Sequence, residues 1–390
     1  MRALRLDFAS DPPLSLTDVE PPKLPPGGDW VRLRPRLSGI CGSDVSLLRF
    51  SSSMFLAPLM DLPATLGHEI VADDEDGRRV TVDVVLGCEA LGREDRCPPC
   101  AAFQPQGCRR FGEDAGGVIG YADTTGGGWS EDMVAPWTNV FEVPAELTDT
   151  QAALLEPAAV SLHAALLGPV RPPVLVVGAG VVGLTAVAAL RALDPGLEIV
   201  ALAKHAHQAV AAEEAGATAV RIRADGSHAE ELAAGSGARL AGPSVDQPTV
   251  AGGFATVFEC VGATPAVDLA FRFTQERGTT VLVGGSAYAE GLDLAPTWAK
   301  ELRILGSYCY GYEEVEGERI RTFDLLHRLV AEGRLRLGEW VTHRFALEDY
   351  AAALGAALGK GSGALKVAFE PAREPGADEG NRVDLDQNGA

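Results

Sequence analysis

The sequence predicts an α/β protein that joins a doubly wound parallel sheet to a second domain rich in β-strands. Three observations support this fold class. An apolar run at residues 174–177 leads into a glycine pattern, Gly178-x-Gly180-x-x-Gly183, and strand and helix patterns alternate from there to about residue 306. Before residue 150, by contrast, short strand patterns follow one another between turns. Alternating strands and helices are typical of a parallel sheet, whereas short strands separated by turns are typical of antiparallel β-structure.

The chain length indicates two domains, because 390 residues exceed what one ordinary hydrophobic core organises. We expect residues 1–160 and 312–370 to form the strand-rich domain and residues 161–311 to form the parallel-sheet domain. The last residues, 371–390, are polar, acidic and poor in aliphatic side chains, so we expect a disordered acidic tail there.

The composition argues against several classes of partner. A net charge of −21 disfavours nucleic acid and anionic membrane surfaces, because binding to both depends on lysine and arginine. No apolar run reaches the about 20 residues of a membrane helix, and the first residues lack the apolar centre of a signal peptide. We therefore expect a cytoplasmic protein, in which the seven cysteines are better suited to metal binding than to disulfides.

In the strand-rich domain, alternating polar and apolar residues predict a half-buried strand at Trp30–Leu37. Gly126–Gly128 is expected to form a tight connection and not a phosphate-binding loop, because no apolar strand leads into it. An alanine-rich helix is predicted at Thr148–Leu167. Further elements predicted for this domain are strands Arg78–Val85, Trp137–Val143, Trp340–Phe345 and Leu365–Phe369 and helix Arg321–Glu332.

The parallel-sheet domain is predicted from the regular alternation of apolar strands with helical patterns. Residues Ala224–Gly253 fit no clear period and are expected to form a loop-rich excursion. The elements predicted for this domain are strands Val174–Val177, Glu198–Leu202, Ala219–Ile222, Thr256–Cys260, Thr280–Val283 and Arg303–Gly306 and helices Val181–Leu193 and Gln208–Ala215.

The glycine pattern predicts a dinucleotide-binding site of the Rossmann type. Its glycines let the chain turn tightly and bring a pyrophosphate close to the N-terminus of the following helix. A strand before the pattern, a helix after it and a second strand about twenty residues later supply the context that the motif requires. The residues expected to contact the cofactor here are Gly178, Gly180, Val181, Val182, Gly183 and Gly262.

Cys41 and the pair His68-Glu69 form the first potential metal site. Thiolate, imidazole and carboxylate are zinc ligands, and three protein ligands with one open position are what a catalytic zinc requires. Each residue alone is weak evidence, since isolated cysteine and histidine side chains are usually structural. The dinucleotide pattern strengthens the hypothesis, because a Lewis acid beside a nicotinamide ring is chemically useful.

Four cysteines between residues 88 and 108 form the second potential metal site. The pair Cys97 and Cys100 can hold one tetrahedral metal, and Cys88 and Cys108 would complete a set of four thiolates. A redox-active pair fits less well, because two prolines separate its cysteines and two further cysteines lie nearby. The cysteines outside this cluster, which are expected to be core residues in apolar strands, are Cys260 and Cys309.

Together these motifs resemble the zinc-containing medium-chain alcohol and polyol dehydrogenases, in particular the sorbitol and threonine dehydrogenase branch. The resemblance covers about residues 1–370. The motifs that carry it are GICGSD (39–44), LGHE (66–69), the cysteine cluster (88–108), LLEPAAVSLHA (154–164), VVGAGVVG (176–183) and THRFALED (342–349). It implies a β-rich, GroES-like catalytic domain beside the Rossmann domain, with zinc and NADP or NAD as cofactors.

The resemblance also implies roles for individual residues. Cys41 and His68 would bind a catalytic zinc, with Glu69 as a direct or alternating ligand and Glu156 as a further ligand, direct or through water. Ser43 would hand on the proton of the substrate. In addition, Asp44 would fix the tautomer of the histidine ligand. We expect His163 to be structural. We expect the same of Tyr121 and Trp298, for which lining the substrate pocket is the alternative role.

The sequence departs from the family pattern at four places, one of which is the loop-rich segment Ala224–Gly253, where relatives commonly have a regular helix. Many relatives have a histidine five residues after the zinc cysteine to carry the proton outward, where this chain has Ser46. Glu94 stands where the first structural cysteine is usual, so either Cys88 reaches in across a longer loop or Glu94 supplies an oxygen. Thiolate is the more usual structural ligand, which favours Cys88. The segment between Glu69 and Val80 is short, which implies a trimmed hairpin.

The end of the second strand of the parallel sheet bears on the choice of nicotinamide. An NAD site places Asp or Glu there to bind the ribose 2′-hydroxyl, whereas this chain has Ala203, followed by Lys204 and His205. Without the acid a 2′-phosphate is not repelled, and a neighbouring cation attracts it. The sequence therefore predicts a preference for NADP, with NAD as the alternative if Lys204 and its neighbours are only a solvated turn.

The predicted function is zinc-dependent hydride transfer between an alcohol or polyol, or the matching carbonyl, and NADP or NAD. One alternative is a zinc-free quinone- or enoyl-type reductase of the same superfamily, whose members lack the Cys41, His68 and Glu69 set. Another is a non-catalytic protein that binds cofactor and zinc. The expected partners are a small-molecule alcohol or carbonyl substrate and further copies of the chain in a homodimer or homotetramer.

Overall fold

The computed structural model describes residues 1–25, 29–111, 113, 117–242, 248–285, 287–359 and 363–376. The chain divides into two compact units, of which unit 1 comprises residues 1–156, 309–325 and 339–390 and unit 2 comprises residues 157–308 and 326–338. Residues 326–338 thus belong to unit 2, although we expected them in the strand-rich domain. Of the expected disordered tail, residues 371–376 form turns and residues 377–390 lie outside the described residues.

Unit 2 contains the predicted parallel sheet. Its strands are β9 (Val174–Val177), β10 (Ile199–Ala203), β11 (Thr218–Arg221), β14 (Phe254–Glu259), β15 (Thr274–Leu282) and β16 (Arg303–Gly306). Within the described residues the six strands lie in the order β11-β10-β9-β14-β15-β16, and every neighbouring pair is parallel. This order reverses beside β9, the first strand, as in a doubly wound sheet. The predicted fold class of this unit is therefore confirmed.

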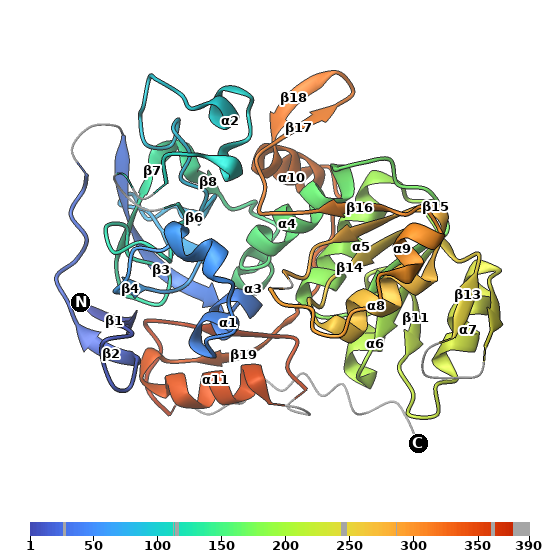
Figure 1. The fold of residues 1–390 in the computed structure, drawn as a ribbon. Coiled ribbons are helices and arrows are strands. Elements are labelled where there is room, and N and C mark those ends of the chain that lie inside the picture. The colour runs from blue at the N-terminus through green and yellow to red at the C-terminus, as the bar shows by residue number, and fades with distance from the viewer. Residues whose placement is uncertain are drawn as a thin grey trace. The chain divides into compact units, whose positions relative to one another are not determined.

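Helices cover the sheet of unit 2. They are α4 (Leu155–Leu166), which begins at the last residues of unit 1, α5 (Val181–Leu193), α6 (Ala206–Glu214), α7 (His228–Ser236), α8 (Thr264–Phe273), α9 (Ala295–Ala299) and α10 (Thr322–Ala331), which continues from unit 1. Helix α5 packs on β9, β10 and β14, and helix α6 packs on β10 and β11. Helix α8 packs on β14 and β15, and these three elements are labelled in Figure 1. All four side chains of β9 are buried, and the core around it includes Leu175, Val177, Leu202, Phe254 and Val257.

Unit 1 is rich in strands. They are β1 (Arg2–Leu6), β2 (Leu14–Asp18), β3 (Trp30–Gly39), β4 (Ala64–Thr65), β5 (Glu69–Asp73), β6 (Arg79–Val82), β7 (Met133–Pro136), β8 (Val140–Glu142), β17 (Tyr312–Val315), β18 (Glu318–Arg321), β19 (Val341–Phe345) and β20 (Lys366–Phe369). In the described part of the chain, seven of them form one sheet in the order β19-β20-β3-β5-β6-β8, with β7 also paired to β3. Strand β20 comes from the end of the chain and lies beside β3, so the C-terminal segment completes this unit.

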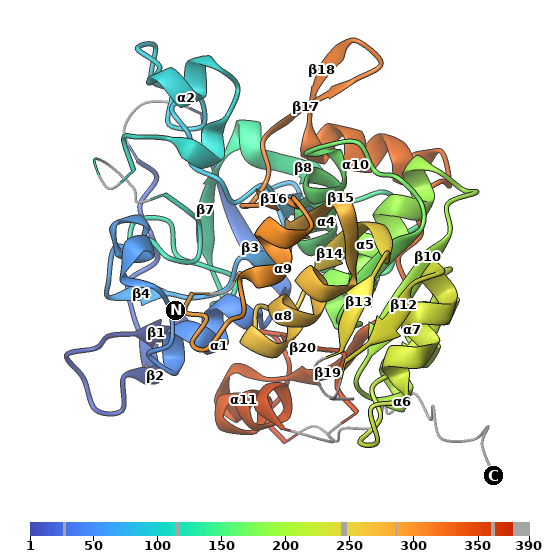
Figure 2. The ribbon, with the colours of Figure 1, turned by 45° about the vertical axis from the view of Figure 1, so that its right-hand side comes forward.

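The helices of unit 1 are short. They are α1 (Gly42–Leu48), α2 (Pro98–Ala101), α3 (Asp149–Ala152), α11 (Tyr350–Leu358) and the 3-10 helices Met54–Leu59, Pro105–Gly107, Trp137–Asn139 and Leu347–Asp349. The core of the unit contains Leu4, Leu6, Leu66, Trp129 and Phe369, and the rings of Trp129 and Phe369 meet edge to face with centroids 5.0 Å apart. Strands β17 and β18 form a hairpin that projects from this unit (orange in Figure 2).

Four local expectations were wrong. The predicted strand Trp137–Val143 begins as the 3-10 helix Trp137–Asn139 and continues as β8. The predicted helix at residues 148–167 is interrupted at 153–154 and becomes α3 and α4. The predicted loop at residues 224–253 contains α7 and a two-stranded hairpin of β12 (Arg239–Ala241) and β13 (Thr249–Ala251). Cys309 lies outside any strand, with a positive φ of 48°. Among the described residues, no helix combines the length and the apolar character needed to cross a membrane.

Candidate metal and cofactor sites

Cys41, His68 and Glu69 converge in unit 1, and their potential ligand atoms all lie within 4.8 Å of one another. Strands β3 and β5 bring them together, because Gly39 at the end of β3 pairs with Glu69 at the start of β5. Cys41 follows β3 directly as the N-cap of α1. His68 and Glu69 are 7% and 1% exposed, so the cluster is largely shielded from water. A thiolate, an imidazole and a carboxylate at this spacing match the donor set of a zinc site.

Asp44 lies beside His68, whose Nδ1 is buried without a hydrogen-bond partner among the described residues. One oxygen of Asp44, Oδ2, accepts a hydrogen bond from the backbone N–H of Cys41 at 2.9 Å, and Oδ1 is 3.5 Å from His68 Nδ1. The other ring nitrogen, His68 Nε2, is 3.5 Å from Ser43 Oγ. Burial opposes protonation of His68, but the negative charges of Asp44 and Cys41 outweigh it and raise the histidine pKa well above its usual value. This excess of negative charge is what a bound cation would neutralise.

Glu69 has one paired oxygen and one unpaired oxygen. Its Oε1 is 2.6 Å from Nζ of Lys366, a buried residue of β20 that also donates a hydrogen bond to the carbonyl oxygen of Ile40 at 3.1 Å. Its Oε2 is buried without a hydrogen-bond partner among the described residues. A carboxylate oxygen left in this state is costly unless a proton or a metal ion satisfies it. The donor set and the orphaned oxygen together fit a metal ion.

Glu156, near the N-terminus of α4, lies outside the group whose ligand atoms are within 4.8 Å of one another in the described structure. It is 5% exposed, and burial raises its pKa to about 7 although the charge of His68 acts in the opposite direction. A hydrogen bond with Tyr310 also lowers this pKa. The charges of His68 and Glu69 act on the Glu156 carboxyl in opposite directions.

Tyr121 contacts three residues at or beside the first metal cluster: Ser43, Asp44 and His68. Its hydroxyl oxygen is 3.0 Å from Ser43 Oγ and donates a hydrogen bond to Asp44 Oδ1 at 3.0 Å. Its ring centroid is 5.3 Å from that of His68. We expected Tyr121 to be structural or to line a pocket, and no local sequence signal connects it to Ser43. The other two residues considered with it are His163, which is buried, and Trp298, which is exposed in unit 2.

The four cysteines Cys88, Cys97, Cys100 and Cys108 form a second buried group, with ligand atoms within 4.8 Å of one another. The Sγ atom of Cys108 is 3.8 Å from those of Cys88 and Cys97, too far for a disulfide. Backbone N–H groups of Arg109 and Arg110 donate to the sulfurs of Cys97 and Cys108 at 3.4 Å. The sequence left either Cys88 or Glu94 as the fourth ligand of this group. Glu94 is exposed and outside the group, whereas Cys88 is part of it.

The electrostatics of the cysteine group favour a thiolate. Burial raises the pKa of Cys97, but backbone hydrogen bonds from Arg109 and Cys100 outweigh burial and lower it to about 6. Burial raises the pKa of Cys100 instead. Four sulfurs packed this closely need a cation to carry four negative charges, because buried like charges repel one another. The geometry therefore fits a tetrahedral structural metal and not a redox pair.

A cavity of ≈ 890 Å³ in unit 2 begins at the glycine pattern. Gly178 and Gly180 line it, and Gly180 is the N-cap of α5. Gly178 has a φ of +96°, and a Cβ on Gly183 would lie 1.8 Å from the carbonyl oxygen of Gly178. A Cβ on Gly180 would meet nothing within 4 Å, which leaves open space at the helix N-terminus. This is the arrangement in which a pyrophosphate can approach backbone N–H groups.

Other expected cofactor contacts lie beside this cavity and not in its described lining. Val181 opens α5 and is buried, Val182 is half-buried, and the N–H of Gly262 donates to Glu259 Oε1 at 2.9 Å. Because these residues lie outside the described cavity lining, we expect them to support the glycine loop and not to line the cofactor site. Cys260 does line the cavity and is only partly buried, so the expectation of a plain core residue was wrong.

The lining of the same cavity also includes residues at and beyond the end of β10. Ala203 is fully buried at the end of β10, and Lys204 and His205 follow it into the lining. Arg223 and His228, which sequence reasoning missed, line the cavity as well. Arg223 is paired with Glu231 and is exposed. An NAD site would have an Asp or Glu at the end of the second strand, which here is β10. Neither β10 nor the turn after it contributes such an acid to the described cavity lining.

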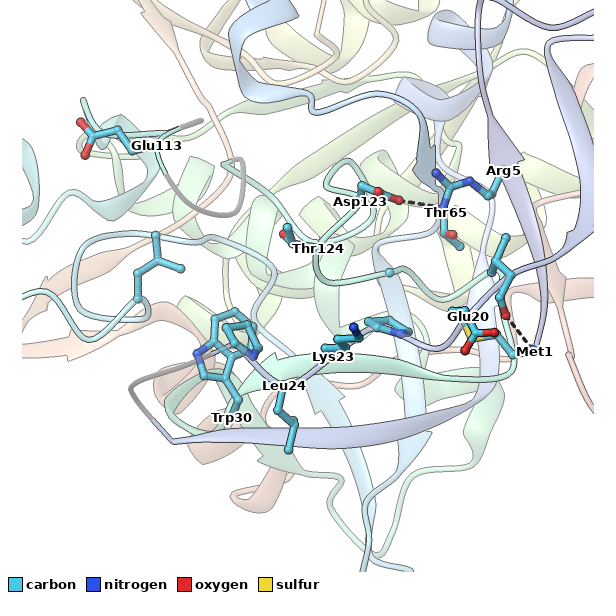
Figure 3. A pocket seen from close by; sticks show the side chains of 15 residues that line it. Met1, Arg5, Glu20, Lys23, Leu24, Trp30, Thr65, Glu113, Asp123 and Thr124 are labelled. Atoms are coloured by element: carbon cyan, nitrogen blue, oxygen red, sulfur yellow. Dashed lines mark hydrogen bonds and ion pairs between the residues drawn. The ribbon is translucent and has the colours of Figure 1, made fainter.

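A second large cavity, of ≈ 920 Å³, lies in unit 1 (Figure 3). Its lining includes Arg5, Lys23, Trp30 and Asp123 and none of the potential metal ligands. Arg5 and Asp123 form an ion pair of 2.7 Å, which Figure 3 shows. Because none of the convergent Cys, His and Glu ligand groups lines this cavity, it is not the candidate metal site.

Comparisons with known proteins point in one direction. A family model described as a zinc-binding dehydrogenase matches residues 181–324, and one described as an alcohol dehydrogenase GroES-like domain matches residues 27–145. L-idonate 5-dehydrogenase of Vitis vinifera is 25% identical over 90% of this chain and 91% of its own length. (R,R)-butanediol dehydrogenase of Bacillus subtilis (strain 168) is 28% identical over 95% of this chain and 100% of its own.

Solved structures agree with these matches. A crystal structure from Sinorhizobium meliloti 1021, assigned as a zinc-binding dehydrogenase and bound to NADP, superposes with a TM-score of 0.70. It is 27% identical, and the match covers 95% of this chain and 99% of that one. The similarity extends over both units and includes the segments that carry the two metal clusters and the glycine pattern.

Proposed function

The chain belongs to the zinc-containing medium-chain alcohol and polyol dehydrogenases, and on this basis we propose that it transfers a hydride between an alcohol or polyol and NADP or NAD. The observation that carries the proposal is the convergence of Cys41, His68 and Glu69 with an orphaned carboxylate oxygen. The cavity at the glycine pattern supports it, because it supplies the cofactor site. When bound, zinc acts as a Lewis acid that favours loss of the alcohol proton, and the nicotinamide accepts the hydride.

The residues of the cluster have distinct roles in this proposal. Cys41, His68 and Glu69 hold the catalytic zinc, and Glu156 assists directly or through water. Asp44 fixes the His68 ring through Nδ1, which leaves Nε2 on the side of the ligand group. Ser43 is exposed and takes the substrate proton on toward water. Tyr121 holds the Ser43 side chain, so the outward route does not require the histidine that Ser46 replaces.

The cysteine group has a structural role in the proposal. Four buried thiolates leave no open coordination position, which distinguishes a structural zinc from a catalytic one. Cys88, Cys97, Cys100 and Cys108 would therefore bind a second zinc that holds the segment between them. The zinc-free reductase alternative is disfavoured, because such proteins lack the catalytic ligand set that converges here.

The function is tested by turnover measured together with metal content. A panel of alcohols, polyols and matching carbonyls, each offered with NADP and with NAD, is expected to reveal activity in a preparation with two zinc ions per chain. Removal of zinc with a chelator should abolish the activity, and added zinc should restore it. Cofactor binding without turnover on the whole panel would support the non-catalytic alternative instead.

The preference for NADP is the finer part of the proposal. A 2′-phosphate at the end of β10 would meet Lys204 and His205 in the cavity lining, with Arg223 and His228 also present. The absence of an acid at Ala203 removes the usual hydrogen bond to the NAD 2′-hydroxyl. The NADP-bound structure at 27% identity is compatible with this preference.

Introducing an acid at this position is expected to reverse the preference. Ala203→Asp should lower the ratio of kcat/KM for NADP to kcat/KM for NAD by roughly 10- to 100-fold, because a carboxylate repels the phosphate at short range. Lys204→Ala should lower the same ratio in the same direction by removing an attraction. Steady-state kinetics with both cofactors measure the ratio. An unchanged ratio in both variants would refute the assignment of this end of the cavity.

Assembly and location are proposals as well. The edge strand β16 exposes Ile304 and unpaired backbone groups, and we propose that it mediates a homodimer or homotetramer, which light scattering would detect. We also propose a cytoplasmic location, because the free cysteines of the metal cluster stay available as thiolates in a reducing compartment.

A further inference from the structure

Lys366 is a buried lysine that the proposed mechanism does not use. It lies in β20, is 7% exposed, and places Nζ 2.6 Å from Glu69 Oε1 and 3.1 Å from the carbonyl oxygen of Ile40. The short distance between Nζ and the Glu69 carboxylate is that of a buried ion pair. The positive charge of Lys366 thus lies against one member of the metal cluster.

Glu69 is the residue for which this charge matters. The ammonium of Lys366 occupies Oε1, whereas Oε2 is buried without a hydrogen-bond partner among the described residues. A cation bound at Cys41 and His68 would need the same carboxylate. Two cations therefore compete for one negative charge in a site that is shielded from water, where electrostatic interactions are strong.

We propose that Lys366 is a positioning residue that weakens the bond between Glu69 and the catalytic metal, and so keeps one coordination position available for substrate. The inference rests on the proposed function, because it assumes that Cys41 and His68 hold the metal. It assigns to Glu69 the role of an alternating ligand. With Lys366 in place, the Glu69 carboxylate would remain near the metal without being a permanent ligand.

Lys366→Met tests the inference, because it keeps the aliphatic stem and removes only the charge. We expect the affinity of the catalytic site for zinc to rise about 10- to 100-fold, since a repulsive charge is lost and Glu69 is released. Competition with a chelator in the full-length chain measures this affinity. In the cobalt-substituted protein, the visible spectrum should change as the carboxylate joins the metal. The value of kcat should fall although the metal is retained.

Thermal stability provides a readout that a merely structural lysine would not produce. Without metal, Lys366→Met leaves a buried carboxylate unpaired, so the metal-free variant should unfold at a lower temperature than the metal-free wild type. Metal then satisfies that carboxylate, and the rise in Tm on metal loading should be larger in the variant than in the wild type. A purely structural role predicts an equal rise in both.

Three control variants isolate the effect. Lys366→Arg keeps the charge and should bind zinc as the wild type does. Lys300→Met makes the same chemical change in unit 2, where a half-buried lysine donates to three carbonyl oxygens, and should not alter metal affinity. Glu69→Gln combined with Lys366→Met should gain little affinity over Glu69→Gln alone, because Lys366 acts mainly through Glu69.

The possible results separate the inference from the function on which it rests. An affinity in Lys366→Met that equals or falls below that of the wild type would overturn the inference. If Lys366→Met does not fold, Lys366→Gln carries the same expectation with a neutral hydrogen-bond donor. If the wild type itself binds no metal that His68→Ala removes, the proposed function fails and the role of Lys366 fails with it.

Discussion

Replacing His68 with alanine is expected to remove one of two zinc ions from each chain and to abolish turnover. His68 supplies the imidazole of the cluster, and its removal leaves a thiol and a carboxylate that are too few to hold zinc. A zinc ion held by these residues would supply several kcal/mol of stabilisation to negative charge on the substrate oxygen, so kcat should fall by at least about 10³- to 10⁴-fold. Elemental analysis and steady-state kinetics on the same preparation measure both losses.

His343→Ala is the matched control for this variant. His343 is half-buried in β19 of the same unit, its Nδ1 contacts the hydroxyl of Thr342, and it is not a member of the metal-ligand group. Its replacement should leave both zinc ions and most of the activity. His68→Ala must also retain the zinc of the cysteine group, which shows that unit 1 is still folded. Substantial turnover in a His68→Ala preparation that holds a single zinc would reject the metal mechanism.

The parts of the protein that could be predicted from sequence are those whose signal is local. The strand, glycine turn and helix around Gly178–Gly183 follow one another in the chain, so propensity and hydrophobic period were enough to predict β9 and α5. The four clustered cysteines lie within 21 consecutive residues, 88–108, and their spacing indicated a common metal. Cys41 and His68 were found through ligand chemistry and family resemblance, and the pairing of β3 with β5 explains why they meet.

The parts that were missed depend on contacts between distant segments. Lys366 is 297 residues from Glu69 in the chain, and nothing near either residue in the sequence indicates that they form an ion pair. Tyr121 is 78 residues from Ser43 and reaches it only because its turn and helix α1 come together in unit 1. Helix α7 was missed for a different reason. Its segment is rich in Gly, Ser and Ala, so its apolar period is too weak to be recognised without the sheet on which it packs.

Removing one ligand of the cysteine group is expected to have the largest effect on stability. Cys100→Ser should eliminate the second zinc and lower Tm by roughly 10 °C or more, because structural zinc sites commonly contribute a large share of local folding free energy. The segment has little else to hold it. Its buried core consists of the four cysteines, and its helix α2 has only four residues, too few to be stable alone.

The loss should extend beyond the cysteine segment, which limited proteolysis would reveal. Phe103 of this segment packs edge to face against Tyr312 with ring centroids 5.3 Å apart, and the guanidinium of Arg319 lies 4.3 Å from the centroid of the Phe103 ring. Loss of zinc should therefore release the β17–β18 hairpin as well, with new cleavage within residues 88–108 and 312–321. Cys309→Ser removes a thiol outside the cluster and should keep both zinc ions. Unchanged stability and unchanged zinc content in Cys100→Ser would show that this group does not bind a structural metal.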